Sequence, residues 1–405
     1  MPEQLQYFSV GMSDPENKRS LEITRRQALK AGSVLALGGT AAILAACGGS
    51  DSSSARQPKN EKAVKHPKAV IGTLVVSNWP LYMKKQLLDD WKKEAKADLR
   101  YLEDYSDNES FFLSVQSQLR SGKPIGRDLI IPSDWAAADW IENGWAEPLD
   151  KSNIPNLKKL MPEIKDQLVY DTNQKYTVPY QAGVTGIAYN ADKVTPASFA
   201  DFFLPANRNK FALLASWRDT LCLYMLLTGK DLKTASLKSY LSSIDSLEIK
   251  LENQGNIQFT DSSYTKLLAA NKIDSCVAWS GEIAQLQQDN PRIQFLVPPE
   301  GGMIWTDSLM IPQGARSPYG AESFMNFLYD PQVAAQLSSY TGMVSPVLGA
   351  AEFVSQQLAY DPLRFPDPTS LTGLSPYPNN LKQDELRQIS TRWAKLTGQK
   401  AGQLA

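Results

Sequence analysis

Short apolar runs alternate along the chain with segments whose apolar residues recur every three or four positions. The first pattern is typical of buried strands and the second of amphipathic helices. Between residues 69 and 143 they alternate regularly, as predicted strands at 69–77, 98–102 and 128–131 and predicted helices at 84–96, 109–120 and 135–143. This order favours a parallel sheet covered by helices on both faces, with ligands outside the carboxyl ends of the strands.

A second α/β region follows. Two strand patterns, 176–180 and 186–189, are separated by the small residues Ala182 and Gly183, where the chain is predicted to cross into a second lobe. That lobe is predicted from strands at 210–215, 275–278 and 293–297 and helices at 219–227, 237–247, 264–270 and 282–288. The chain then recrosses near Trp305. Two crossings predict two rigid lobes that close about a ligand as a hinge.

One apolar run, residues 301–311, contains an acid. Proline and glycine residues bound the run, as they bound a short buried strand. Residues two apart in a strand face the same side, so Trp305 and Asp307 would offer an aromatic face and a carboxylate to one cavity. This pair suits an organic cation. The alternative is a core tryptophan beside an acid that caps a neighbouring helix.

Composition and charge narrow the function classes. The chain has 42 Lys+Arg against 43 Asp+Glu and a formal net charge of -1, without a basic footprint for nucleic acid. The single histidine, His66, precedes the globular body, which disfavours a zinc site or a Ser-His-Asp triad there. We therefore expect no metal and no cofactor. Cys222 and Cys276 are too few for a disulfide framework, and they either pair or lie in the core.

The N-terminal segment is predicted to be an export signal, residues 1–47. Residues 24–30, TRRQALK, resemble a twin-arginine motif ahead of an apolar run too short to remain in a membrane. The run ends in LAACG, which resembles a lipobox whose Cys47 would become the lipidated first residue of the mature protein; the alternative is an ordinary membrane anchor helix. Residues 48–68 are polar and are predicted to be a flexible tether.

Six motifs, in this order, resemble those of the extracytoplasmic spermidine/putrescine-binding proteins, which deliver polyamines to ABC importers. They are SNWPLY at 77–82, YSDNE at 105–109, DLIIPS at 128–133, VPY at 178–180, AWSG at 278–281 and GGMIWTDSL at 301–309. The resemblance implies an α/β, two-lobed fold of the type II periplasmic-binding-protein kind, each lobe a mixed or parallel sheet flanked by helices. With the two crossings, it assigns 69–183 and 307–350 to lobe 1, and 184–306 and 351–405 to lobe 2.

The resemblance also implies which residues bind the ligand. Trp305 and Asp307 match the hinge tryptophan and the main ammonium-binding aspartate of that family. Trp79 and Tyr82 match aromatic residues of the first lobe, and Trp279 matches an aromatic residue of the second. A further match, Ser133 with Trp135 nearby, falls on the turn after the third strand.

The second lobe departs from the family pattern. Two acids three residues apart become Ser216 and Asp219, so one acid is kept. A polyamine needs a carboxylate for each terminal ammonium, because a buried unpaired cation is costly. Asp307 would take one end, and Asp219 or Glu282 the other. The predicted ligand-binding set is therefore Trp79, Tyr82, Ser133, Trp135, Asp219, Trp279, Glu282, Trp305 and Asp307.

The sequence thus predicts a monomeric, lipid-anchored extracytoplasmic protein that captures a putrescine- or spermidine-class polyamine and passes it to ABC permease subunits. It predicts binding without catalysis. One alternative is the same fold with another small cation, an amino acid or a sugar as ligand. A second is a secreted carboxylate-dependent enzyme, for which the chain offers acids but no motif.

Overall fold

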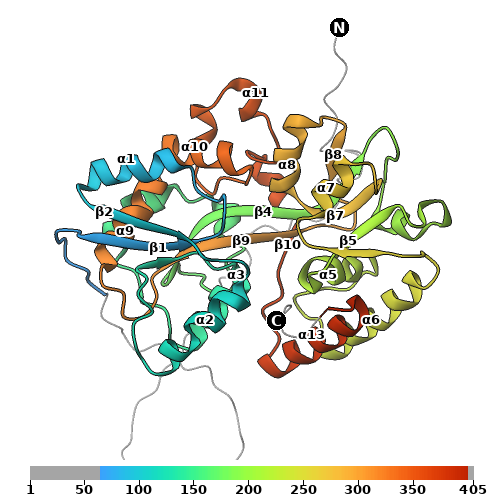
Figure 1. Ribbon diagram of the computed structural model, residues 1–405, viewed down its shortest axis with the longest axis horizontal. Coiled ribbons are helices and arrows are strands. Elements are labelled where there is room, and N and C mark those ends of the chain that lie inside the picture. Colours follow the sequence, from blue (N-terminus) through green and yellow to red (C-terminus); the bar gives the residue numbers. More distant parts are fainter. Residues whose placement is uncertain (1–63, 400–405) are drawn as a thin grey trace, which may run out of the picture. The chain divides into compact units, whose positions relative to one another are not determined.

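The computed structural model describes residues 64–399, and two long strands run through the middle of this region. Strands β4 (Thr177–Asn190) and β9 (Met303–Met310) pair antiparallel along most of their length. The other strands extend the sheet on either side in the order β2-β1-β3-β9-β4-β7-β5-β6, while β10 pairs with β9 and β8 with β4. Helices gather around the two ends of the sheet and form two halves (Figure 1).

The first half confirms the predicted alternation of strands and helices. Strand β1 pairs in parallel with β2 and β3, as expected when helices connect successive strands. Its elements are β1 (Thr73–Asn78), α1 (Lys85–Ala95), β2 (Asp98–Glu103), α2 (Asn108–Arg120), β3 (Leu129–Ile130) and α3 (Asp134–Glu142). Later segments complete it: α4 (Pro162–Lys165), α9 (Pro318–Leu328) and α10 (Pro331–Thr341).

The second half is also α/β, and its sheet is mixed. Strand β5 is parallel to β6 and β7, whereas β7 and β8 are antiparallel to β4. Its elements are β5 (Phe211–Leu214), α5 (Trp217–Leu227), α6 (Leu237–Leu251), β6 (Gln258–Thr260), α7 (Tyr264–Ala269), β7 (Ser275–Trp279), α8 (Ser280–Asp289) and β8 (Ile293–Leu296). The C-terminal segments are α11 (Gln356–Ala359), α12 (Pro368–Leu371), β10 (Ser375–Pro376) and α13 (Gln383–Thr397).

The crossing at Ala182 and Gly183 differs from the prediction. It lies inside one continuous strand, β4, and not between two strands, because β9 provides backbone partners on both sides of it. Gly183 lies opposite Trp305, and a Cβ at Gly183 would stand 2.2 Å from the indole ring. Glycine therefore makes room for the tryptophan and does not break the strand.

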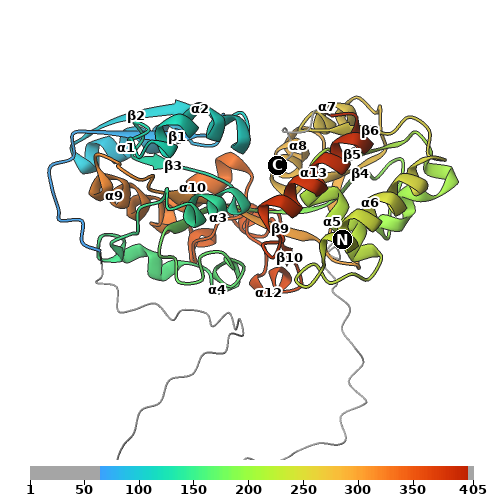
Figure 2. The same cartoon turned by 90° about the horizontal axis from the view of Figure 1, so that it is seen from below.

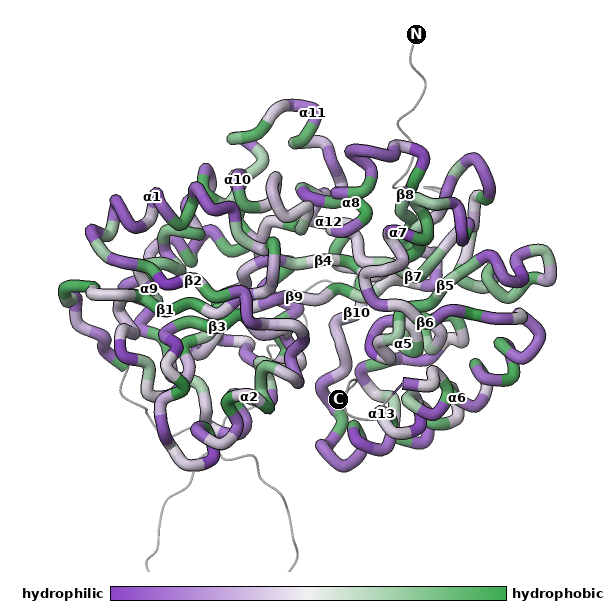
Figure 3. Tube along the Cα trace, in the orientation of Figure 1, coloured by the Kyte–Doolittle hydropathy of each residue, from purple (hydrophilic) through white to green (hydrophobic). Residues whose placement is uncertain are grey.

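Two large hydrophobic cores correspond to the two halves. The first collects buried residues of α1, β1 and α9, such as Trp91 and Phe324, and the second those of α5, α6 and β7. Green, hydrophobic segments occur in strands such as β1 and β3, the central strands β4, β9 and β10 are paler, and purple segments are frequent on the outer helices (Figure 3). Cys222 and Cys276 are both buried and unbonded in the second core, which resolves the earlier alternative in favour of core residues.

Two sets of contacts run across predicted boundaries. The tether is predicted to extend to residue 68. His66 nevertheless contacts the body: its Nδ1 lies 2.7 Å from Glu322 Oε1, and its backbone N–H donates to Asp150. Both carboxylates are buried, and a buried carboxylate needs hydrogen-bond partners. Leu371 and Leu374 were placed in lobe 2 but pack in the first core. The reason is that β10 pairs with β9 at Met303 and Ile304, so the chain returns through the middle before α13. Within residues 64–399 no helix is long and apolar enough to cross a membrane.

Candidate ligand-binding site

Asp307 is the centre of the candidate site. It lies in β9 with 7% of its surface exposed, two residues from Trp305 at 9%. Tyr82 donates its hydroxyl to Oδ2 over 2.8 Å, and Ser133 donates to Oδ1 over 2.7 Å. The structure thus brings four of the predicted residues together. Both donors are neutral, and no ion pair involves Asp307 within residues 64–399.

Local structure holds these two donors in place. Tyr82 packs edge-on against Tyr180, whose hydroxyl donates to the Tyr82 carbonyl. Ser133 exchanges two hydrogen bonds with the side chain of Asn108, at 3.0 and 3.1 Å. Asn108 is the first residue of helix α2, and the cap of that helix is Asp107, which accepts from the Ser110 backbone N–H over 2.7 Å. That leaves the Asn108 amide free to orient Ser133.

Burial dominates the electrostatics of this carboxyl. It raises the pKa of Asp307 to about 6, and the hydrogen bonds from Ser133 and Tyr82 offset part of the rise. Burial also raises the pKa of neighbouring Asp134 to about 7, and the charge of Asp307 adds to that rise. A nearby cation stabilises the anionic form of a buried carboxyl whose pKa is raised. The site is therefore suited to an ammonium group.

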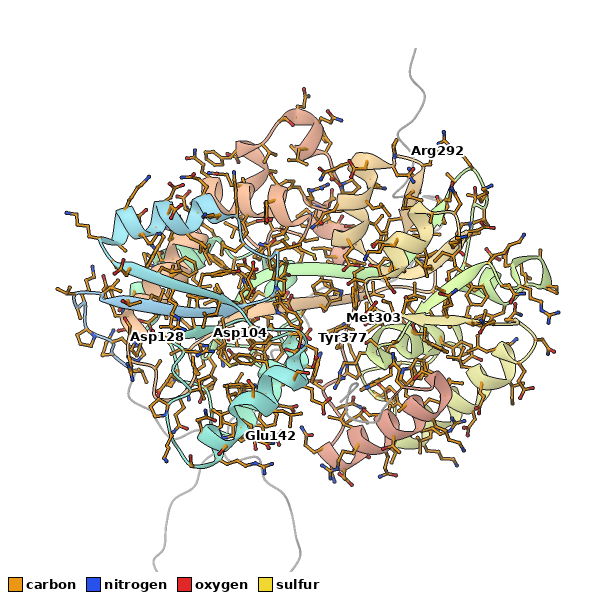
Figure 4. The ribbon with its side chains drawn as sticks, viewed as in Figure 1. Asp104, Asp128, Glu142, Arg292, Met303 and Tyr377 are labelled. Carbon is orange, nitrogen blue, oxygen red and sulfur yellow. The ribbon has the colours of Figure 1, made fainter. Side chains whose placement is uncertain are left out.

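A second carboxylate, Asp219, accepts hydrogen bonds from three side chains. It lies in α5 with 1% exposure, and its Oδ1 accepts from Thr185, from Trp279 Nε1 at 3.1 Å and from the Tyr377 hydroxyl at 2.6 Å. Trp279 and Asp219, both members of the predicted ligand-binding set, thus contact each other. Tyr377 was missed by the sequence reasoning, because the segment before α13 has no periodic pattern. Figure 4 places Tyr377 beside Met303, in the middle of the sheet.

The remaining predicted residues lie around these two carboxylates. Glu282 accepts from Ser262 and interacts with Tyr264, so it belongs to a separate cluster from that of Asp219. Trp79 donates its indole N–H to the Ile131 carbonyl over 2.9 Å and packs 5.1 Å from Tyr105. Within residues 64–399 no hydrogen bond or ion pair joins Trp79 or Glu282 to Asp307, and the roles of these two residues stay predictions.

Trp135 lies where the two halves meet. The guanidinium of Arg218, from α5 of the second half, stands 3.9 Å from the centre of its ring. Nearby, Gln383 of α13 donates to Asp139 of α3 over 2.5 Å, and these two helices approach each other in Figure 2. Side chains of both halves thus contact one another beside Asp307 and Asp134. Arg218 is not among the predicted site residues, because arginine at a helix start carries no specific signal.

Known proteins share this architecture. Residues 127–371, more than half of the chain, match the family described as bacterial extracellular solute-binding protein. The chain belongs to this family. The structure of the PotD substrate-binding protein of a spermidine/putrescine ABC transporter from Streptococcus pneumoniae aligns with a TM-score of 0.71 at 24% identity, covering 81% of this chain and 99% of that one. The type II periplasmic-binding-protein fold expected from the six motifs is confirmed.

Two curated relatives are similar to this solute-binding protein in sequence. The spermidine/putrescine-binding periplasmic protein of Salmonella typhimurium is 27% identical over 303 residues, 74% of this chain and 85% of that protein. The putrescine-binding periplasmic protein SpuD of Pseudomonas aeruginosa is 28% identical over 344 residues, 80% and 91% of the two chains. Both names describe binding proteins. The predicted export signal and Cys47 lie outside the described residues.

Proposed function

We propose that this protein captures a polyamine of the putrescine or spermidine class between its two halves and delivers it to an ABC importer. The observation that carries the proposal is Asp307, a buried carboxylate that is held by two neutral donors and lies beside Trp305. An ammonium would complete this arrangement, since a buried anion is strongly stabilised by a cation. The names of the two curated relatives agree with this ligand class.

The proposal includes an extracytoplasmic localisation for the protein. The export motif and the lipobox at Cys47 support a lipid-anchored, extracytoplasmic protein that acts as a monomer beside its permease. Residues 48–68 would form the tether between the lipid and the body, with Lys65 and His66 in contact with Asp150 and Glu322. Lobe 1 would comprise residues 69–183 and 307–350, and lobe 2 residues 184–306 and 351–405. Leu371 and Leu374 of the last range pack in the first core.

Thermal unfolding with candidate ligands tests the ligand class. A ligand at 100 times its Kd is expected to stabilise the protein by about 2.7 kcal/mol, because it binds only the native state. We expect this shift with putrescine or spermidine and none with neutral sugars or amino acids at the same concentrations. Absence of a shift with every polyamine would contradict the proposal. A shift with sugars alone would favour the other ligand class.

Polyamine affinity is expected to depend on pH through Asp307. Its pKa of about 6 in the free protein lies above the ordinary 3.8, so the carboxyl is largely protonated below pH 6 and cannot pair with an ammonium. Affinity should therefore fall by about tenfold for each pH unit below about 6 and level off above about 7. Titration calorimetry in two buffers of different ionisation enthalpy would detect the proton released on binding.

The raised pKa of Asp307 also makes the folding stability of the ligand-free protein depend on pH. The unfolded chain releases this proton near pH 3.8, at a lower pH than the folded chain does, so Asp307 lowers stability as pH rises from about 4 to about 6.

The control for the pH dependence of affinity is Asp134→Asn, because Asp134 titrates near pH 7 and interacts with Asp307. This variant should keep a binding midpoint between pH 5 and 6.5, roughly where Asp307 titrates. A pH-independent affinity between pH 5 and 7 would argue against an Asp307 contact with the ligand.

A further inference from the structure

The first described residues lie in a socket on the first half, formed by Asp150, Asn153 and Glu322. Glu322 of α9 is completely buried, and its carboxylate accepts from the Asp150 backbone N–H over 2.6 Å and from Asn153 Nδ2 over 2.7 Å. The ring nitrogen Nδ1 of His66 lies 2.7 Å from the same carboxylate, and Asn153 donates to the His66 carbonyl over 2.8 Å. Lys65 Nζ lies 3.3 Å from Asp150 Oδ1. These contacts attach Lys65 and His66 to the body.

The socket holds these two residues independently of strand β1. Residues 67–70, which connect them to the strand, are exposed, and Val70 is 100% exposed. Apart from His66, the partners of Glu322 are a side-chain amide and a backbone N–H, which carry no charge. A buried carboxylate with neutral donors alone is costly, so a further partner from the N-terminal segment stabilises it. The socket therefore determines where the chain leaves the body towards its N-terminus.

A basic rim adjoins this socket. The name denotes residues 151–169, which comprise the 3-10 helices η1 (Lys151–Asn153) and η2 (Pro155–Lys159), helix α4 and the turn after it. The rim has four lysines against two acids, while the whole chain is balanced, with 42 Lys+Arg against 43 Asp+Glu. These charged residues are Lys151, Lys158, Lys159, Lys165, Glu163 and Asp166. Figure 2 shows α4 at the lower edge of the first half, on the opposite side from α2.

Three lysines of the rim are available to an external partner. Within residues 64–399 no ion pair involves Lys158, Lys159 or Lys165. Two aliphatic side chains accompany them, since Val169 is 40% exposed and Leu348 is 42% exposed. Leu348 adjoins the rim because its backbone N–H donates to the Lys159 carbonyl over 2.8 Å. Lysines around aliphatic side chains suit the headgroup region of a bilayer, where cations meet anionic lipids and aliphatic groups reach the acyl boundary.

We propose that the basic rim rests on the surface of an anionic lipid bilayer. The inference rests on the lipid-anchored localisation proposed above, and it identifies the face of the body that meets the lipid. A lipid on Cys47 would be separated from His66 by 18 residues, and a flexible tether of that length has an end-to-end distance of about 25 Å. Because the chain leaves the body beside the rim, the tether keeps the rim near the surface. A weak attraction is then sufficient to orient the body.

The test measures the orientation of the mature, lipidated protein on vesicles by energy transfer to an acceptor dye on the lipid headgroups. The donor dye is attached at Thr172→Cys, beside the rim, or at Ser117→Cys in α2, on the opposite side of the first half. Thr172 adjoins the rim because the carbonyl of its neighbour Asn173 accepts from Lys151. The native thiols of the body, Cys222 and Cys276, are buried and should not react. We expect more transfer from position 172 than from position 117 on vesicles of phosphatidylcholine with phosphatidylglycerol, and a smaller difference on phosphatidylcholine alone.

A matched pair of variants makes the test specific for the rim. Lys158→Gln combined with Lys159→Gln should weaken the preference for this orientation by roughly 30-fold and so remove the difference on anionic vesicles. The control is Lys92→Gln combined with Lys93→Gln on α1, which removes the same charge from the same half and should keep the difference. High salt should act as the rim variant does, because it screens the attraction between lysines and lipid.

Equal transfer from the two positions on anionic vesicles, or the same loss in both lysine variants, would overturn the inference. A rim variant that keeps the wild-type difference but no longer associates with the permease would also overturn it, because the rim would then bind protein. Calorimetry with putrescine separates these results from the ligand proposal. The rim variant should keep wild-type affinity, since Asp307 and its two donors lie outside the rim. Absence of polyamine binding in the wild type would overturn the ligand class alone, whereas a mature N-terminus without lipid would overturn the localisation and this inference together.

Discussion

Replacing Asp307 by asparagine is expected to weaken polyamine binding by roughly 150- to 5,000-fold. The change keeps the shape of the side chain but removes the negative charge, and leaving a buried cation without its partner costs about 3–5 kcal/mol. Folding stability should change little or rise slightly, since the buried carboxyl is costly to ionise in the free protein. Calorimetry with putrescine and urea unfolding of the same samples would separate the two effects.

The matched control for this change is Asp192→Asn. Asp192 pairs with Arg292 over 2.9 Å at the surface, where their side chains are 54% and 69% exposed. Exposed pairs contribute little, so neither affinity nor stability should change measurably. Figure 4 shows Arg292 at the periphery, far from the labelled Tyr377 in the middle. Wild-type affinity in Asp307→Asn would remove the main support for the proposed function.

Gly183→Ala is expected to displace Trp305. The new Cβ would lie 2.2 to 2.7 Å from three ring atoms of the indole, closer than real contacts allow. The ring or strand β4 must shift, and overpacking of this kind costs about 1–3 kcal/mol of stability. Polyamine affinity should fall by about tenfold or more, because Trp305 would leave its place beside Asp307. Urea unfolding and calorimetry would measure both losses.

Two further variants make this test specific. Gly72→Ala adds the same methyl group where nothing lies within 4 Å, so its stability should stay within about 0.5 kcal/mol of the wild type. A smaller ring should relieve the clash, so Gly183→Ala combined with Trp305→Phe should be more stable than the sum of the single changes predicts. Additive losses would show that the two residues do not compete for the same space.

The sequence predicted the side chains that follow from local pattern. Alternation along a strand placed Trp305 and Asp307 on one face, and in the structure Asp307 accepts hydrogen bonds from Tyr82 and Ser133. The alternating order of elements, the motifs and the family all pointed to the same α/β fold. These features could be predicted because they depend on residues close together in sequence or on short motifs shared with a known family.

Contacts between distant segments could not be predicted in this way. Tyr377 reaches Asp219 across 158 residues, and Arg218 meets Trp135 across the junction of the halves. Hydrophobic spacing carries no information about such pairs, because they depend on how complete elements pack. The continuity of β4 was missed for the same reason, since the partner that keeps the crossing in strand conformation is β9, more than a hundred residues later.

The position of β9 in the sheet has a consequence for folding on the ribosome. Strand β9 lies between β3 and β4, yet it is made only after about three quarters of the chain has been synthesised. Until then β3 has an unpaired inner edge, and β4 lacks the partner that covers most of its length. Exposed strand edges invite pairing with other chains. The nascent protein therefore has a long interval in which a chaperone would protect it from aggregation.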